Sequence, residues 1–111
     1  MRALPKASSL HEAVKQVIES NKKDGYTPEQ LVQAIGNGNN PDLFNICDGM
    51  IARGDTLHYL TPALKKFPAL LTLEDFVVKY GASWGFSAGT IEIAKARVKW
   101  YDHMTGKKRY E

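Results

Sequence analysis

The sequence predicts a mainly α-helical fold with one small β-hairpin, in the order three helices, hairpin, two helices. Apolar residues recur at spacings of three and four in five segments, and most of these segments lie between a capping residue and a glycine. Between residues 56 and 72 the pattern changes to loosely alternating β-forming residues. The 111 residues, 43% of them apolar, match the size of one ordinary domain, which we predict to span 1–111.

The first predicted helix begins after Ser9, whose hydroxyl can cap the free backbone N–H groups of a helix start. Leu10, Val14 and Val17 follow at helical spacing, so they share the face that we expect to be buried. Gly25 is placed to end this helix, because glycine readily adopts the left-handed conformation that closes one.

The motif "TPEQ" (27–30) predicts the start of a second, short helix. Thr27 is placed as the N-cap and Pro28 as the first helical residue, and Gln30 stands where its side chain can return a hydrogen bond to the Thr27 amide. Gly36 is expected to end this helix.

A third helix is predicted within "NNPDLFNICDGMIARGD" (39–55), where Asn40 before Pro41 repeats the order of a cap followed by a proline. Gly54 is placed to end it. The apolar residues of this helix form one stripe that includes Cys47, so we predict that the Cys47 thiol is buried and inert. The stripe consists of Leu43, Phe44, Cys47, Met50 and Ile51.

The β-hairpin is predicted directly after the third helix. "TLHYLT" (56–61) is rich in β-forming residues and is predicted as a strand, and "ALLT" (69–72) as a short return strand. "PALKKFP" (62–68) is bracketed by prolines and is predicted as the connecting loop, which places Lys65 and Lys66 at the tip of the hairpin.

Two further helices are predicted in the last third of the chain. Thr72 is placed as the N-cap of one, so Glu74 and Asp75 are interpreted as helix-start acids rather than a catalytic pair. Ser87 is placed to cap a longer helix over residues 88–104. The apolar residues of that helix follow a three-four spacing, namely Ile91, Ala94, Val98 and Tyr101.

Residues 26–60, "YTPEQLVQAIGNGNNPDLFNICDGMIARGDTLHYL", resemble the winged-helix pattern, in which a short helix and a longer helix precede a β-hairpin called the wing. The resemblance covers residues 9–72 as the core and leaves 73–111 as a C-terminal helical extension with a basic tail. It implies that the third helix lies in a DNA major groove and that the wing contacts the backbone or the minor groove. Such small modules are common among phage and mobile-element regulators, so the resemblance also implies a role in transcription regulation.

Positive charge is concentrated in the second half of the chain. Residues 1–56 hold six Lys and Arg against seven Asp and Glu, whereas residues 57–111 hold nine against five. Basic residues interleaved with aromatic ones, as in the last helix, are typical of a nucleic-acid surface, so the predicted partner is double-stranded DNA. The predicted nucleic-acid-binding residues are Lys65, Lys66, Lys95, Arg97, Lys99, Lys107, Lys108 and Arg109.

The third helix carries acids where a DNA-reading helix usually carries cations, because carboxylates are repelled by phosphates. The alternative prediction is therefore a protein–protein interaction adaptor. Its partner-binding residues would be those off the apolar stripe, namely Asp42, Asn45, Asp48 and Arg53. Trp100 lies off the main apolar stripe of the last helix, which favours a homodimer contact there.

Neither a catalytic nor a metal-binding pattern is present in the sequence, so we expect neither an enzyme nor a metal or other cofactor. The three histidines, His11, His58 and His103, are isolated in sequence and lack metal-ligand spacing. No apolar run approaches the roughly 20 residues of a membrane helix, and the N-terminus lacks the pattern of a signal peptide. A cytoplasmic location away from membranes is therefore predicted.

Overall fold

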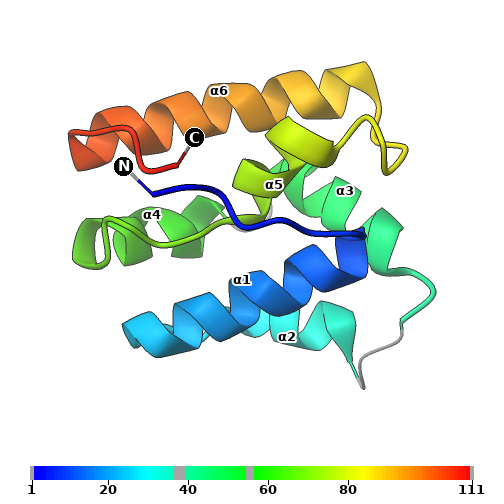
Figure 1. Ribbon diagram of the computed structural model, residues 1–111, viewed down its shortest axis with the longest axis horizontal. Helices are drawn as coiled ribbons and strands as arrows, with labels where there is room; N and C mark the ends of the chain where they lie inside the picture. Colours follow the sequence, from blue (N-terminus) through cyan, green and yellow to red (C-terminus); the bar gives the residue numbers. More distant parts are fainter. Residues whose placement is uncertain (1, 37–39, 55–56, 111) are drawn as a thin grey trace.

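The computed structural model describes residues 2–36, 40–54 and 57–110. In these residues the chain forms six α-helices and no strand (Figure 1). The β-structure of the described residues is one isolated parallel bridge between Arg2 and Tyr110. The helices are α1 (Leu10–Asp24), α2 (Glu29–Ile35), α3 (Leu43–Arg53), α4 (Leu57–Lys66), α5 (Leu73–Tyr80) and α6 (Ala88–Thr105).

Helix α6, with 18 residues, is the support on which α3, α4 and α5 pack. Helix α1 packs against α2 and α5, and α2 also contacts α3. Figure 1 shows α6 along one side of the molecule, α1 and α2 along the other, and α5 between them. The molecule measures 36 × 29 × 26 Å along its principal axes. The mainly α-helical part of the prediction is therefore confirmed.

Three predicted helix starts are confirmed. The hydroxyls of Ser9 and Ser87 each accept a hydrogen bond from the backbone N–H three residues on, at 3.2 and 3.1 Å. Thr72 and Asp75 form a capping box, in which the Thr72 amide donates to Oδ2 of Asp75 at 2.9 Å and the Asp75 amide donates to Oγ1 of Thr72 at 3.3 Å. Caps are local, so the sequence alone specifies them.

Helices α2 and α3 start later than predicted. Helix α2 begins after Pro28 and has no side-chain cap, so the predicted capping box between Thr27 and Gln30 is wrong. Before α3, the side chain of Asn40 accepts a hydrogen bond from the amide of Asp42 at 3.0 Å. This bond closes a turn ahead of the helix, because asparagine readily bonds the backbone two residues on.

The predicted wing is wrong: a helix, α4, occupies residues 57–66, and no β-hairpin is present in the described residues. The first residue of the predicted hairpin, Thr56, lies outside those residues. Leu60, Ala63 and Leu64 recur at helical spacing and pack in one cluster with Tyr101 of α6. Packing against a neighbour overrides the β-propensity of "TLHYLT", which is a weak preference by comparison. Pro62 lies inside α4 and removes one backbone hydrogen bond from it.

The predicted return strand at 69–72 has no partner strand in the described chain, because side chains bond its carbonyl groups instead. Tyr110 Oη donates to the carbonyl of Ala69 at 2.7 Å. Arg109 Nη1 donates to that of Leu70 at 2.7 Å, and Asn21 Nδ2 to that of Leu71 at 2.9 Å. Three consecutive backbone acceptors are satisfied in this way, so the segment needs no sheet.

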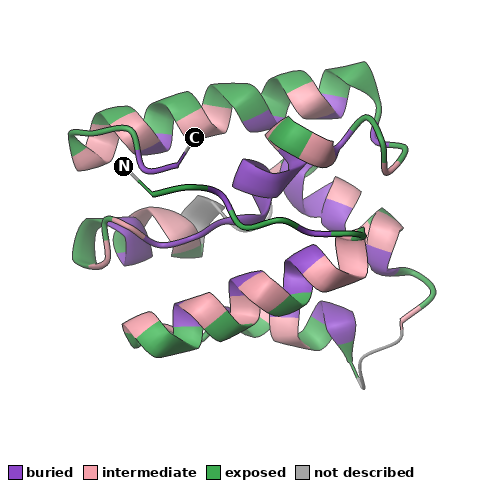
Figure 2. Cartoon of the chain, viewed as in Figure 1, coloured by how far each residue is buried: buried purple, intermediate pink, exposed green. Residues whose placement is uncertain are grey.

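The buried apolar residues form two clusters. The larger one joins α1, α2, α3, α5 and α6 and includes Val14, Leu31, Ile51, Phe76 and Ala94. The smaller one joins α4 to α6 and consists of Ala63, Leu64, Leu70 and Tyr101. Figure 2 shows buried residues on the inner faces of the helices and exposed residues along the outward face of α6. Helix α4 is therefore held mainly by α6.

Candidate nucleic-acid interface

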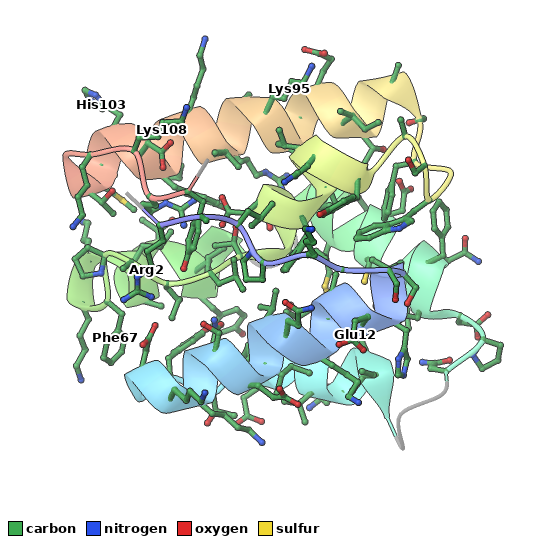
Figure 3. The ribbon with its side chains drawn as sticks, in the orientation of Figure 1. Arg2, Glu12, Phe67, Lys95, His103 and Lys108 are labelled. Carbon is green, nitrogen blue, oxygen red and sulfur yellow. The ribbon has the colours of Figure 1, made fainter. Side chains whose placement is uncertain are left out.

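Three helices, α1, α4 and α6, finish at the same end of the molecule, the left-hand end of Figure 1. Helices α1 and α4 each bring two lysines to that end, the tail after α6 brings two more, and the N-terminal segment adds an arginine. Figure 3 places Arg2 and Lys108 there, together with the ring of Phe67. All seven cationic residues are exposed, and we call them the basic end: Arg2, Lys22, Lys23, Lys65, Lys66, Lys107 and Lys108.

Direct contacts hold the segments of the basic end together. The ring of Phe67, which follows α4, packs on Gly25 at the end of α1, where a Cβ would lie 3.7 Å from it. Tyr110 Oη donates to the carbonyl of Ala69, and the amide of Arg2 donates to the carbonyl of Arg109 at 3.1 Å. The ends of α1 and α4, the C-terminal tail and the N-terminal segment are therefore fixed relative to one another.

Nearby negative charge offsets the basic end only in part. Asp24 ends α1 and Glu29 begins α2, so both lie near the turn between these helices. Each helix C-terminus also carries roughly half a negative charge, which the lysines of the last turn stabilise. Among the described residues, the seven cations exceed this sum, so their positive potential extends into solvent over about 8 Å at physiological salt.

Arg109 does not belong to this surface, although the sequence predicts it to bind nucleic acid. Its side chain is 0% exposed and is paired with the carboxylates of Asp75 and Asp102, at 2.9 and 3.0 Å. Its Nη1 also donates to the carbonyl of Leu70 at 2.7 Å. The guanidinium is fully engaged inside the protein, so Arg109 holds the tail in place.

Arg97 is internal as well. Its side chain is 11% exposed, and its Nη1 donates to the carbonyl of Met50 at 3.2 Å and lies 3.8 Å from Oε2 of Glu74. These contacts join α6 to α3 and α5. A residue that bridges three helices in this way is not available to phosphates.

Lys95 and Lys99 are exposed on α6 but lie apart from the basic end. Figure 3 shows Lys95 in the half of α6 that is remote from Arg2 and Lys108. Its ammonium group is 3.2 Å from the carboxylate of Glu92, one turn earlier on the same helix. The predicted set is therefore divided: Lys65, Lys66, Lys107 and Lys108 lie together, and Lys95 and Lys99 form a separate part of the surface.

Three residues of the basic end, Arg2, Lys22 and Lys23, were not predicted as binding residues. They lie in the half of the sequence where acids outnumber bases by one. The prediction looked for binding residues in the half with net positive charge, so these three were not included. The structure brings the end of α1 beside the end of α4 and the tail, and only that arrangement reveals a common surface. Lysines in the last turn of a helix are a weak sequence signal, since they also stabilise the helix end.

The acidic third helix uses one of its carboxylates inside the protein. Oδ1 of Asp48 accepts a hydrogen bond from the hydroxyl of Thr90 at 2.9 Å, which joins α3 to α6. The guanidinium of Arg53 folds back over Gly49, so closely that any Cβ there would collide with it. The remaining residues of the alternative set, Asp42 and Asn45, are exposed. Asp48 therefore has a structural explanation that does not involve a partner.

Cys47 is buried in the core, as its place in the apolar stripe predicted. Burial raises the pKa of its thiol to about 12, so the thiol stays protonated at neutral pH. Among the described residues, no group of three His, Cys, Asp or Glu side chains is arranged to hold a metal ion. The hydroxyl of Tyr101 donates a hydrogen bond to Oε2 of Glu74 at 2.7 Å. Burial raises the pKa of the Tyr101 hydroxyl and that of the Glu74 carboxyl group.

Comparisons of the chain with protein-family models, with curated proteins and with solved structures find no match. In the described part of the chain, every helix is too short or too polar to cross a membrane. The case for a function therefore rests on the surface itself, where the basic end brings together exposed cationic residues from separate segments of the chain.

Proposed function

We propose that the protein is a non-enzymatic, regulatory DNA-binding protein that holds double-stranded DNA through the basic end. The observation that supports this is the gathering of seven cationic side chains from three helix ends and the N-terminal segment on one end of the molecule. Cations at such a surface release the counterions condensed on DNA, which supplies most of the affinity of nonspecific binding.

The composition of the basic end indicates contact with phosphates rather than with bases. Six of its seven residues are lysines, whose ammonium groups act as mobile point charges. Base reading relies on groups such as arginine, which form paired hydrogen bonds to guanine. We therefore expect binding that tolerates many sequences. In this proposal the basic end lies along the DNA backbone, and α3 stays packed on α2 and α6.

The test is a salt titration of binding to random duplex DNA. The double variants Lys65→Ala with Lys66→Ala and Lys107→Ala with Lys108→Ala should each reduce the slope of log K against log salt by up to about two. The matched control is Lys15→Ala with Lys79→Ala, which removes the same charge from exposed positions of α1 and α5 outside the basic end. Its slope should not change. Absence of binding at low salt, or equal slope changes in the control, would overturn the proposal.

A second candidate is self-association through the outward face of α6, where Ile93 and Trp100 are 36% and 45% exposed. They are seven residues apart, so they lie on one face of the helix. In an antiparallel pair of α6 helices, Ile93 of one protomer lies beside Trp100 of its partner, and the acidic Glu92 lies near the basic Lys99 of the other chain. One helix pair buries less than a standard interface of about 1,600 Å², so this dimer would be weak.

Sedimentation equilibrium over a range of protein concentrations tests self-association. Trp100→Glu should abolish a concentration-dependent dimer. Tyr59→Glu is the control, because Tyr59 is another exposed aromatic residue, 57% exposed, on a different helix. A protein that stays monomeric at the highest concentration, or a dimer that both variants disrupt equally, would exclude the α6 face as the contact.

A further inference from the structure

A cavity of about 620 Å³ lies between α1, α2, α4 and the start of α5. Its volume falls within the range of roughly 300–1,000 Å³ that is usual for small-molecule sites. Five of the helices, including α3, contribute apolar side chains to its wall, namely Val17, Leu31, Met50, Leu60 and Leu73. The cavity is distinct from the basic end, none of whose residues lines it.

Among the described residues, the ionisable side chains in the cavity wall are all carboxyl or phenol groups. Its ionisable carboxyl groups belong to Glu29 and Glu74, and its aromatic rings to Tyr26 and Tyr59. No Lys, Arg or His occurs among the described residues that line it. Carboxylates and the faces of tyrosine rings both attract organic cations, and tyrosine does so while also offering apolar contact.

The burial of these residues shows how the wall is arranged. Glu29 and Tyr59 are exposed and therefore lie at the mouth, whereas Tyr26 is half-buried. The pKa of the Tyr26 hydroxyl is raised, first by burial and second by the charge of Glu29, so Tyr26 lies near Glu29. Glu74 is only 3% exposed and therefore lies at the floor. The mouth thus combines a carboxylate with aromatic rings, and the interior is mostly apolar.

Glu74 is held from behind, on the side away from the cavity, by residues of α6. Its Oε2 accepts the hydroxyl of Tyr101 at 2.7 Å and lies 3.8 Å from Nη1 of Arg97. Neither Tyr101 nor Arg97 lines the cavity, so the positive charge of Arg97 is separated from the cavity by the glutamate. A ligand therefore meets the carboxyl group rather than the guanidinium.

We propose that this cavity binds a small organic ammonium compound, with its apolar body between α1, α2 and α4 and its cationic group against Glu29, Tyr26 and Tyr59. The apolar interior contributes affinity through burial of the ligand's hydrocarbon part. The acidic and aromatic mouth selects for positive charge and against carboxylates of the same shape.

Three compounds of equal chain length test the proposal on the 111-residue protein: n-octylammonium, 1-octanol and octanoate. Binding is measured by calorimetry and by amide chemical shifts in NMR spectra. We expect n-octylammonium to bind about tenfold more tightly than 1-octanol, and octanoate to bind most weakly. Equal affinity for all three compounds, shifts that map outside the cavity wall, or no binding at millimolar concentration would overturn the proposal.

Variants separate the charge of the mouth from the shape of the cavity. Glu29→Gln should weaken n-octylammonium about threefold and leave 1-octanol unchanged, because an exposed ion pair contributes modestly. Glu19→Gln is the matched control, since Glu19 is an exposed acid of α1 that does not line the cavity. Leu60→Trp should fill the cavity and abolish binding of both compounds. Glu29 is exposed, so its variant is expected to fold. An unchanged affinity of Glu29→Gln for n-octylammonium would contradict the proposed position of the cation.

Discussion

Nη2 of Arg109 lies 2.9 Å from Oδ1 of Asp75, with the two side chains 0% and 3% exposed. The same arginine contacts Asp102 of α6, and the same aspartate caps α5 through Thr72. This pair thus links the C-terminal tail, the start of α5 and the end of α6. Because the tail carries Lys107 and Lys108, the pair also positions part of the basic end.

Removal of the Arg109 side chain should be strongly destabilising. Arg109→Ala leaves the carboxylate of Asp75 buried without its cation, and breaking a buried pair in this way typically costs about 3–5 kcal/mol. Urea unfolding at neutral pH measures the loss. The double variant Arg109→Met with Asp75→Leu removes both charges and should be less destabilised than Arg109→Ala. A loss below about 1 kcal/mol in Arg109→Ala would show that the pair is solvated in solution.

The pKa of Glu74 is raised, chiefly because burial disfavours its charged form. A raised pKa in the folded state means that Glu74 contributes its full stability only below the ordinary glutamate pKa of 4.5, and that this contribution is lost as pH rises through the folded pKa. Glu74→Gln cannot ionise. The variant should therefore gain stability relative to the natural protein as pH increases from 4 to 8.

Urea unfolding of both proteins at several pH values between 4 and 8 provides this comparison. The difference in unfolding free energy between the two proteins isolates Glu74, because all other groups titrate in both. A constant offset is expected, since glutamine replaces the contact with Arg97 less well. A difference that does not change with pH would show that Glu74 has an ordinary pKa.

Tyr101 provides a separate test of the same buried group. Tyr101→Phe removes the hydroxyl that donates to Oε2 of Glu74 and should destabilise the protein by about 1–3 kcal/mol, because the acceptor stays buried. The loss should be smaller when the substitution is made in the Glu74→Gln background, and a double-mutant cycle measures the coupling. Equal losses in both backgrounds would mean that the hydroxyl acts independently of residue 74.

The parts of the fold that the sequence predicts correctly depend on neighbours in the chain. Ser9, Thr72 and Ser87 cap helices because the amide that each one binds is three residues away. The wing prediction failed for the opposite reason. Whether residues 57–66 form a strand or a helix is decided by the surface of α6 on which Leu64 packs, and that surface is made by residues far along the chain.

In the candidate surface, too, local features are predicted from the sequence and features that depend on distant residues are not. A run of bases such as "KKR" predicts a positive tail, and Lys107 and Lys108 are indeed exposed. The burial of Arg109 depends on Asp75, which is 34 residues away, so no local pattern reveals it. The contribution of Lys22 and Lys23 depends likewise on the packing of Gly25 against Phe67.

Pro62 distinguishes the helix α4 from the hairpin that the sequence predicts. A proline inside a helix lacks one hydrogen bond and costs about 3 kcal/mol relative to alanine, partly offset by about 0.4–1 kcal/mol because proline restricts the unfolded chain. Pro62→Ala should therefore raise the unfolding free energy by about 2–2.6 kcal/mol. It should also increase the helical signal in circular dichroism.

Pro68 is the matched control for this substitution. It is exposed like Pro62, but it lies in the turn that the hydrogen bond from the Leu70 amide to the Phe67 carbonyl closes at 3.1 Å. Proline is favoured at this position of a turn, so Pro68→Ala should be neutral or destabilising by up to about 1 kcal/mol. Stabilisation by Pro62→Ala alone requires a helix at residue 62. If both substitutions destabilise the protein equally, residue 62 lies in a loop, and α4 does not form a continuous helix that packs on α6.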